Sequence, residues 1–455
     1  MLNPGTHATR RNRLAAAVDG PILLMGNGHR PRNLPMSPVA FRQDSTFLYF
    51  TGCTQPGAAV LIHDGSSTLY LPPPSEDDAL WHGRVHTIEE TATELGFKSV
   101  RPAGSLEADA ASHSTIATIA VPDLAQTLRA ASITGLPLEY GAVRGHGGLI
   151  DAIIHQRRNL GTEELDEMRK TAVITEAAHR AAMAATHPGA HEQTIAAAFH
   201  NVVMRAGLTL AYPSIATVRG EVLHNFHYVN TCQAGQLFLF DGGAEAATGY
   251  ATDVTRTWPV SGTFNPRQQT AYEAVLEAQL RGIDRARSGT RYREIHTEAS
   301  LVLAQFLADE GLITCTPHSA VETGAQALFF PHGVGHLIGL DVHDLENFGD
   351  RASYPPDRSR SPQFGTGYLR LDLDLEPGMV VTVEPGFYVV PSILEDSTLR
   401  ARFASQVNFD KAEEWAGFGG IRIEDDVVVT EGDPEVLTGS IPKSVKDVIE
   451  AVGAS

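Results

Sequence analysis

Short apolar runs alternate with more polar, helix-like stretches through the first third of the chain. The runs are PILLM at 21–25, AAVLI at 58–62, TLYL at 68–71 and TIATIAV at 115–121, and residues 75–95 read as helical. Apolar runs of this length, bounded by turn residues, predict buried strands. We therefore expect an α/β domain over residues 1–158, in which no catalytic constellation stands out.

A polar stretch, QRRNLGT, precedes a change of pattern near residue 159. A long helix is predicted to begin at Thr162, which can cap it, and to end by residues 187–189. One face of this helix carries Leu165, Met168, Ala172 and Val173. Further helices are expected at about 190–206, 266–287 and 291–310, with Gly207 and Gly311 as stops. Strands lie between them, so residues 159–455 are expected to form an α+β domain with helices covering a mostly antiparallel sheet.

Composition narrows the class of protein. The chain has 455 residues, with 35 basic against 54 acidic side chains and a formal net charge of −19, which argues against nucleic acid or an anionic membrane as the main partner. Its three cysteines form neither a disulfide framework nor a zinc motif. No run reaches the ~20 apolar residues that span a bilayer. The basic N-terminus is a poor signal peptide, so we expect a cytoplasmic protein.

Two aspartates flank a predicted hairpin. LFLFD (237–241) reads as a strand, GYATDVTRTWPV (249–260) as its return, and GGAEAATG as the turn. Asp241 and Asp253 could then face each other across the hairpin. Alternatively, both are turn or edge carboxylates, although Asp241 ends an apolar strand, where an unpaired charge is costly.

Three further segments carry metal-capable residues. PHGVGHLIGLDVHD holds His332, His336 and His343, and its glycines make a helical zinc motif unfavourable. Glu384 ends the apolar strand MVVTVE. In IRIEDDVVV, Arg422 and Glu424 share a strand face, so Arg422 is placed to orient Glu424, unless the two form a surface ion pair.

These residues fit one metal site, made of Asp241, Asp253, His336, Glu384 and Glu424. One imidazole and four carboxylates carry too much negative charge to be buried without cations. An oxygen-rich set favours Mn²⁺ over Zn²⁺. Two ions that share bridging carboxylates could activate one water for hydrolysis. Nucleophile and phosphate-loop motifs such as GxSxG and GxxxxGK[ST] are absent.

In this order the motifs resemble the pita-bread-fold dinuclear metallopeptidases that cleave before proline, Xaa-Pro dipeptidase (prolidase) and Xaa-Pro aminopeptidase (aminopeptidase P). FRQDSTFLYFTG and WHGRVHTIEE resemble their creatinase-type N-terminal domain, and EELDEMRKTAVITEAAHRAAM resembles the helix that opens their catalytic domain. The resemblance implies a creatinase/aminopeptidase P-type domain over 1–158 and a pita-bread catalytic domain over 159–455. It also implies a homodimer.

The resemblance also implies roles for individual residues. Asp241 and Glu424 would bridge two divalent ions, Mn²⁺ first, with Zn²⁺ or Co²⁺ as alternatives. Asp253 would complete one ion's shell, and His336 with Glu384 the other's. Glu384 would act as general base, and His224 and His343 would face the leaving group and the scissile carbonyl. His332 would shape the wall, and Arg422 would support the ligands.

Two features favour a dipeptidase that acts on a peptide with proline after the scissile bond. Arg370 falls where prolidases bind the substrate's C-terminal carboxylate, and the insertion 391–419 resembles eukaryotic-type prolidases. The alternatives are aminopeptidase P action on longer peptides, an inactive pita-bread binding protein and a metal-free creatinase-like hydrolase. The spacing of Asp241 and Asp253 is one residue longer than usual in these families. Residues 346–367 are open to interpretation as a lid or a passive insertion.

Overall fold

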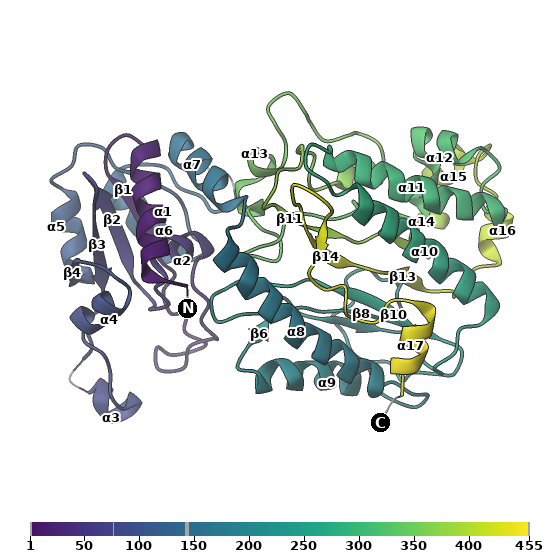
Figure 1. Cartoon of the computed structure of the whole chain (residues 1–455), viewed down its shortest axis with the longest axis horizontal. Coiled ribbons are helices and arrows are strands. Elements are labelled where there is room, and N and C mark those ends of the chain that lie inside the picture. Colours follow the sequence, from purple (N-terminus) through teal and green to yellow (C-terminus); the bar gives the residue numbers. More distant parts are fainter. Residues whose placement is uncertain (1, 76, 142–144, 454–455) are drawn as a thin grey trace. The chain divides into compact units, whose positions relative to one another are not determined.

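The structure, a computed structural model, describes residues 2–75, 77–141 and 145–453. It contains two compact units (Figure 1). The first comprises Met1–Arg158 together with Leu345–Ala352, and the second Asn159–Asp344 together with Ser353–Ser455. In the described part of the chain, no helix combines the length and apolar character needed to cross a membrane.

A five-stranded sheet forms the centre of the first unit. Its strands, in the spatial order β4-β3-β2-β1-β5, are β1 (Ile22–Met25), β2 (Ala59–His63), β3 (Ser66–Leu71), β4 (Ser99–Pro102) and β5 (Ala117–Thr118). The outer pairs β1–β5 and β3–β4 are parallel, whereas β1–β2 and β2–β3 are antiparallel. The four predicted strands are confirmed, although the run at 115–121 contributes only two residues to the sheet.

Seven helices are described in the first unit: α1 (Pro4–Ala17), α2 (Ser45–Thr51), α3 (Asp78–His82), α4 (Ile88–Glu94), α5 (Leu106–Ala110), α6 (Leu124–Thr134) and α7 (Gly147–Arg157). The predicted helical stretch at 75–95 is two short helices, because Gly83 ends α3 with a φ of 74° that favours glycine.

The basic residues near the N-terminus anchor α1 to α2. Arg10 donates to the carbonyl of Tyr49 (3.1 Å) and Arg11 to that of Phe50 (2.7 Å). These carbonyls belong to the last turn of α2, where helical partners are lacking and positive charge is favourable. Every residue of α2 is buried.

The second unit is built from small antiparallel sheets. They have the orders β10-β8-β7, β11-β14-β15, β12-β13 and β6-β9. The bounds are β6 (Thr209–Leu210), β7 (Ile215–Thr217), β8 (Leu237–Asp241), β9 (Ala244–Glu245), β10 (Thr255–Pro259), β11 (Val380–Val383), β12 (Gly386–Tyr388), β13 (Gly420–Arg422), β14 (Asp425–Val428) and β15 (Glu435–Val436). The predicted antiparallel pairing is confirmed. The single strand predicted for IRIEDDVVV divides at residues 423–424, because β13 pairs with β12 and β14 pairs with β11.

Two helix pairs cover these strands, and in Figure 1 the strands β8 and β10 lie between the pairs. The helices are α8 (Thr162–Ala184), α9 (Glu192–Arg205), α10 (Pro266–Arg285), α11 (Tyr292–Asp309), α12 (Pro317–Thr323), α13 (Asp350–Ser353), α14 (Pro391–Leu394), α15 (Ser397–Phe403), α16 (Phe409–Glu413) and α17 (Val445–Ala451). Predicted helices at 190–206, 266–287 and 291–310 are confirmed as α9, α10 and α11. Gly207 and Gly311 follow α9 and α11 with positive φ, as predicted.

Two details of α8 correct the sequence interpretation. The N-cap is Gly161 rather than Thr162, because the Glu164 side chain accepts a hydrogen bond from the Gly161 N–H at 2.7 Å. Met168 and Ala172 are buried as expected, but Val173 is 64% exposed. The buried face of α8 instead carries small and polar residues, including Thr171, Thr175 and His179, which amphipathicity alone does not select.

Residues 346–367 have little regular structure. Leu345–Ala352 packs with the first unit, where Arg351 forms a bidentate ion pair with Asp151 at 2.6 and 2.7 Å. The remainder belongs to the second unit.

Candidate metal centre

The centre begins where two neighbouring strands bring their aspartates together. Asp241 is the last residue of β8 and pairs with Thr255, the first residue of β10. Asp253 lies two residues before β10, and the intervening GGAEAATG is more than a turn, because β9 within it pairs with β6. Tyr212 fixes the relation between the carboxylates: its hydroxyl lies 2.6 Å from Asp241 Oδ1 and also contacts Asp253 Oδ1.

His336 reaches the centre from an irregular segment beside β11. Its N–H donates to Thr382 Oγ1 (3.1 Å), and its carbonyl accepts from the Thr382 N–H (2.9 Å). The approach requires glycine at position 335, where a Cβ would collide with the Thr382 carbonyl. His336 Nδ1 lies 3.0 Å from the Leu337 carbonyl; since a carbonyl only accepts, Nδ1 carries the proton. Nε2 is therefore left to face the carboxylates, 3.5 Å from Asp253 and 3.8 Å from Glu384.

Glu384 and Glu424 lie next to the ends of paired strands. Glu384 directly follows β11, and Glu424 lies at the break between β13 and β14. The N–H of Glu424 donates to the Thr255 carbonyl (3.0 Å), and the Thr255 hydroxyl donates to Glu424 Oε2 (2.7 Å). Thr255 thereby holds both the main chain and the carboxylate of Glu424.

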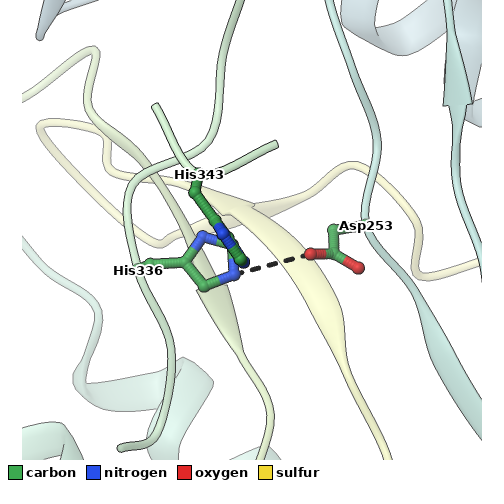
Figure 2. Close-up of side chains that lie close together, drawn as sticks. All are labelled: Asp253, His336 and His343. Carbon is green, nitrogen blue, oxygen red and sulfur yellow. Dashed lines mark ion pairs between the residues drawn. The ribbon is translucent and has the colours of Figure 1, made fainter. Parts of the chain in front are cut away.

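Ligand-type atoms of these residues converge into three overlapping groups within 4.8 Å. The groups are Asp241–Asp253–Glu424, His336–Glu384–Glu424 and Asp253–His336–His343. The structure thus brings together all five side chains selected from the sequence and adds His343 to them. Figure 2 shows the third group, in which the rings of His336 and His343 meet edge to face with centroids 4.3 Å apart.

The charge of this cluster fits divalent cations. Burial and the neighbouring carboxylates raise the pKa of Glu384 to about 7 and that of Glu424 well above its usual range. Burial also raises the pKa of Asp241, despite the opposing charge of Arg422. For Asp253, the hydrogen bond and charge of His336 outweigh burial and lower the pKa. Four carboxylates with one imidazole are an oxygen-rich donor set, and cations would relieve their mutual repulsion.

Arg422 forms hydrogen bonds with residues of the centre. Its guanidinium donates to Asp241 Oδ2 (2.6 Å), Thr255 Oγ1 (2.9 Å) and Tyr388 OH (3.0 Å). Among the carboxylates it therefore contacts Asp241 directly and reaches Glu424 through Thr255. The predicted orienting role of Arg422 toward Glu424 stays a prediction, and the hydrogen bonds that would carry it run through Thr255.

His332 lies next to Glu384 and Tyr388. Its Nε2 lies 2.9 Å from the Tyr388 hydroxyl, and its Nδ1 lies 2.8 Å from the Gly333 carbonyl and 3.9 Å from Glu384 Oε2. Burial, assisted by the charge of Arg422, lowers the pKa of His332 to about 3, so the ring is neutral.

Arg370, His343 and His224 lie near enough to influence one another electrostatically. Arg370 Nη1 lies 3.4 Å from His343 Nδ1. Burial lowers the pKa of His343, assisted by His336 and Arg370. Burial likewise lowers the pKa of the half-buried His224, which also senses the charges of Arg422 and Arg370.

The sequence interpretation missed Tyr212, Thr255 and Tyr388. Thr255 could have been found, because strand alternation places it on the same face as Asp253. Tyr212 and Tyr388 gave no signal, since a single tyrosine beside Pro213 or within an apolar run is common in any core.

The comparisons with known proteins agree with this geometry. The profile of Metallopeptidase family M24 matches residues 166–431, and that of the aminopeptidase P N-terminal domain matches residues 7–117. The chain belongs to metallopeptidase family M24. Its centre is therefore a site for divalent metal ions, and the expected α+β pita-bread fold, preceded by an α/β creatinase-type domain, is confirmed.

Individual relatives carry two kinds of name. The chain is 42% identical over 293 residues to a Xaa-Pro dipeptidase of Xanthomonas campestris, a match covering 64% of this chain and 65% of that protein. It is 29% identical to the human Xaa-Pro dipeptidase, across 94% of this chain and 87% of the relative. Among solved structures it is similar to the aminopeptidase PepP of Pseudomonas aeruginosa, with 27% identity, a TM-score of 0.81, and coverage of 99% of this chain and 98% of that one.

Proposed function

We propose that the chain hydrolyses the peptide bond before proline, with a preference for Xaa-Pro dipeptides. The convergence of Asp241, Asp253, His336, Glu384 and Glu424 carries this proposal. It is supported by the names of the bacterial and human relatives. We take residues 1–158 as the N-terminal domain and 159–455 as the catalytic domain.

The five side chains would hold two divalent ions, and we propose Mn²⁺ ahead of Zn²⁺ or Co²⁺. Asp241 and Glu424 would bridge the pair, Asp253 would complete one shell, and His336 with Glu384 the other. When bound, the ions supply Lewis-acid polarisation of the carbonyl and a nucleophile at neutral pH. The His336 tautomer, with Nδ1 bonded to Leu337, presents Nε2 as the ligand atom.

Glu384 is proposed as the general base that accepts the proton of the attacking water. Its carboxylate lies in the cluster but retains some exposure, which a proton-transfer group needs. His343 and His224 would face the scissile carbonyl and leaving group and donate hydrogen bonds to the developing oxyanion. His332, held by Tyr388 and Gly333, would form the wall.

The dipeptide preference depends on Arg370. Its guanidinium lies beside His343, the imidazole proposed to face the scissile carbonyl. In a dipeptide, the terminal carboxylate is only one residue beyond that carbonyl. A guanidinium at this place would form a charge-assisted pair with the carboxylate and so favour substrates that end at proline.

Aminopeptidase P action on longer peptides is the second candidate, supported by the names of the similar solved structures. The inactive and metal-free alternatives are less favoured, because all five ligand-type side chains are present and converge. We also propose a cytoplasmic homodimer. Exposed apolar residues of the first unit, such as Met36 (79%) and Trp81 (65%), support an interface.

One assay separates the two candidates. Metal-stripped protein is reloaded with Mn²⁺ and given a Xaa-Pro dipeptide beside a Xaa-Pro-Xaa tripeptide. We expect no hydrolysis without metal, and faster hydrolysis of the dipeptide with it. Faster hydrolysis of the tripeptide would replace the dipeptidase assignment with the aminopeptidase one.

A further inference from the structure

A buried carboxylate lies two residues beyond Arg370 and outside the metal centre. The Asp372 side chain is completely buried, and two arginines bind it. Arg291 pairs with it in a bidentate manner, Nε to Oδ1 at 2.7 Å and Nη2 to Oδ2 at 2.6 Å. Arg293 Nη2 lies 3.0 Å from Oδ2. A carboxylate buried this deeply would be costly without such partners.

The two arginines belong to the start of α11, which also holds the main chain of this segment. Arg291 is the N-cap of α11, and the Tyr292 N–H donates to the Leu373 carbonyl at 2.9 Å. The Leu375 N–H donates to the Thr290 carbonyl at 2.9 Å. Residues 369–373 form no regular strand, so these bonds fix the segment where a sheet would otherwise do so.

Residues 353–360 hold the same segment through other groups. The Asp372 N–H donates to the Ser353 carbonyl (2.9 Å), and Arg358 Nη1 donates to the Asp372 carbonyl (2.8 Å). On the other side of Arg370, the Leu369 carbonyl accepts from Tyr354 OH (2.6 Å) and Arg360 Nη1 (2.9 Å). The main chain is therefore tied down immediately before Arg370 and again at Asp372.

We propose that Asp372, clamped by Arg291 and Arg293, is a positioning residue that fixes Arg370 and thereby sets selectivity for substrates ending in a free carboxylate after proline. The inference rests on the proposed function of Arg370. A guanidinium on a flexible segment loses more conformational freedom on binding, so a rigid support raises its contribution to recognition. Residues 353–360 then act as a support for Arg370. This role differs from both a lid and a passive insertion.

The test compares hydrolysis of a Xaa-Pro dipeptide with hydrolysis of its C-terminal amide by the Mn²⁺-loaded, full-length protein. The selectivity is the ratio of the two kcat/KM values. In Asp372→Asn we expect this ratio to fall about tenfold, mainly through KM for the dipeptide, with metal content unchanged. Arg293→Gln, which leaves the bidentate pair with Arg291 intact, should shift the ratio in the same direction by less and covers the case in which Asp372→Asn does not fold.

Two controls make the result specific. Asp433→Asn removes an exposed carboxylate that pairs with Arg287 and contacts neither Asp372 nor the residues that hold it, so the ratio should stay within about twofold of wild type. In an Arg370→Ala background, Asp372→Asn should cause no further loss of selectivity, because it acts through Arg370.

The possible results distinguish the positioning role of Asp372 from the proposed function of the protein. Wild-type selectivity that survives both Asp372→Asn and Arg293→Gln overturns the inference and leaves the proposed function standing. Equal loss of dipeptide and amide hydrolysis would show a general structural role and also overturn it. Wild-type protein that cleaves both substrates equally overturns the inference together with the dipeptide preference, and inactivity on every proline substrate overturns the proposed function itself.

Discussion

The Arg422 guanidinium lies 2.6 Å from the Asp241 carboxylate, and both side chains are almost completely buried. This pair offsets only one of the four carboxylates in the centre. The charge that remains is what two divalent cations would balance, and Arg422 holds Asp241 ready for them. Through Thr255 the Arg422 guanidinium also reaches Glu424, so this one side chain contacts or approaches both proposed bridging ligands.

A second buried ion pair lies directly behind Glu424. Arg256 Nη2 and Asp425 Oδ1 are 2.7 Å apart, both fully buried, and Arg256 also donates to the Glu424 carbonyl. Asp425→Asn would leave the buried guanidinium without its counter-charge, so we expect a loss of about 3–5 kcal/mol in the free energy of unfolding. Urea unfolding of the variant measures this loss. Asp433→Asn, which breaks an exposed pair with Arg287, is the control and should change stability little.

Acid should weaken the same pair. The charges and hydrogen bonds of Arg256 and Lys443 outweigh burial and lower the pKa of Asp425 well below its usual range. A carboxylate with a lowered folded-state pKa contributes stability above its unfolded pKa, about 3.9, and loses it as pH falls toward the folded value. The difference in unfolding free energy between wild type and Asp425→Asn should therefore be constant above pH ~5 and shrink below pH ~4. A difference that grows on acidification would contradict this.

Removing the metal should make stability depend on pH in the opposite direction. In the metal-free protein, burial and neighbouring carboxylates raise the pKa of Glu384 to about 7 and that of Glu424 well above its usual range. Carboxylates with raised folded-state pKa values stabilise below their unfolded pKa, about 4.3, and lose that contribution as pH rises. The Tm of the chelator-treated protein should thus fall from pH 5 to pH 8 more steeply than that of the Mn²⁺-loaded protein. Parallel curves for the two forms would contradict the proposed ligand set.

Arg370→Ala tests carboxylate recognition directly. Loss of a charge-assisted pair should lower kcat/KM for a Xaa-Pro dipeptide, and this loss corresponds to about 1.5–3 kcal/mol of transition-state stabilisation. Amidation of the dipeptide should cost wild type a similar amount and cost the variant little. If the variant hydrolyses dipeptide and tripeptide at wild-type rates, Arg370 does not bind the carboxylate.

The proposed homodimer is tested by light scattering. The FRQDSTFLYFTG segment resembles one that lies near the partner subunit in related families, and the first unit exposes large apolar side chains. We expect a dimer at micromolar concentration. A fully active monomer at that concentration would contradict the proposal.

The sequence was informative where chemistry follows directly from local pattern. Asp241 and Glu384 each come at the end of an apolar run, and the costly position of their charge identified them before any contact was known. Gly207 and Gly311 were found in the same way, because helix stops have a local cause.

Features set by long-range pairing could not be predicted. The break between β13 and β14 depends on partners far away in sequence, and so does the contact of Arg422 with Asp241, which lies 181 residues earlier. The clamp on Asp372 joins α11 to a segment about 80 residues later, and LRLDLD alone reads as an exposed strand edge. Val173 was misplaced because polar residues such as Thr175 and His179 take the buried face of α8.

The most direct test of the account is the metal content and hydrolytic activity of Asp253→Ala beside wild type. Asp253 belongs to two of the three ligand groups, so its loss should empty at least one metal position and abolish Xaa-Pro hydrolysis. Mn²⁺ per chain is measured by elemental analysis and activity on a Xaa-Pro dipeptide in the same sample. We predict two ions and activity in wild type, and at most one ion with no activity in the variant. Full activity in a variant verified to be metal-free would contradict the dinuclear mechanism.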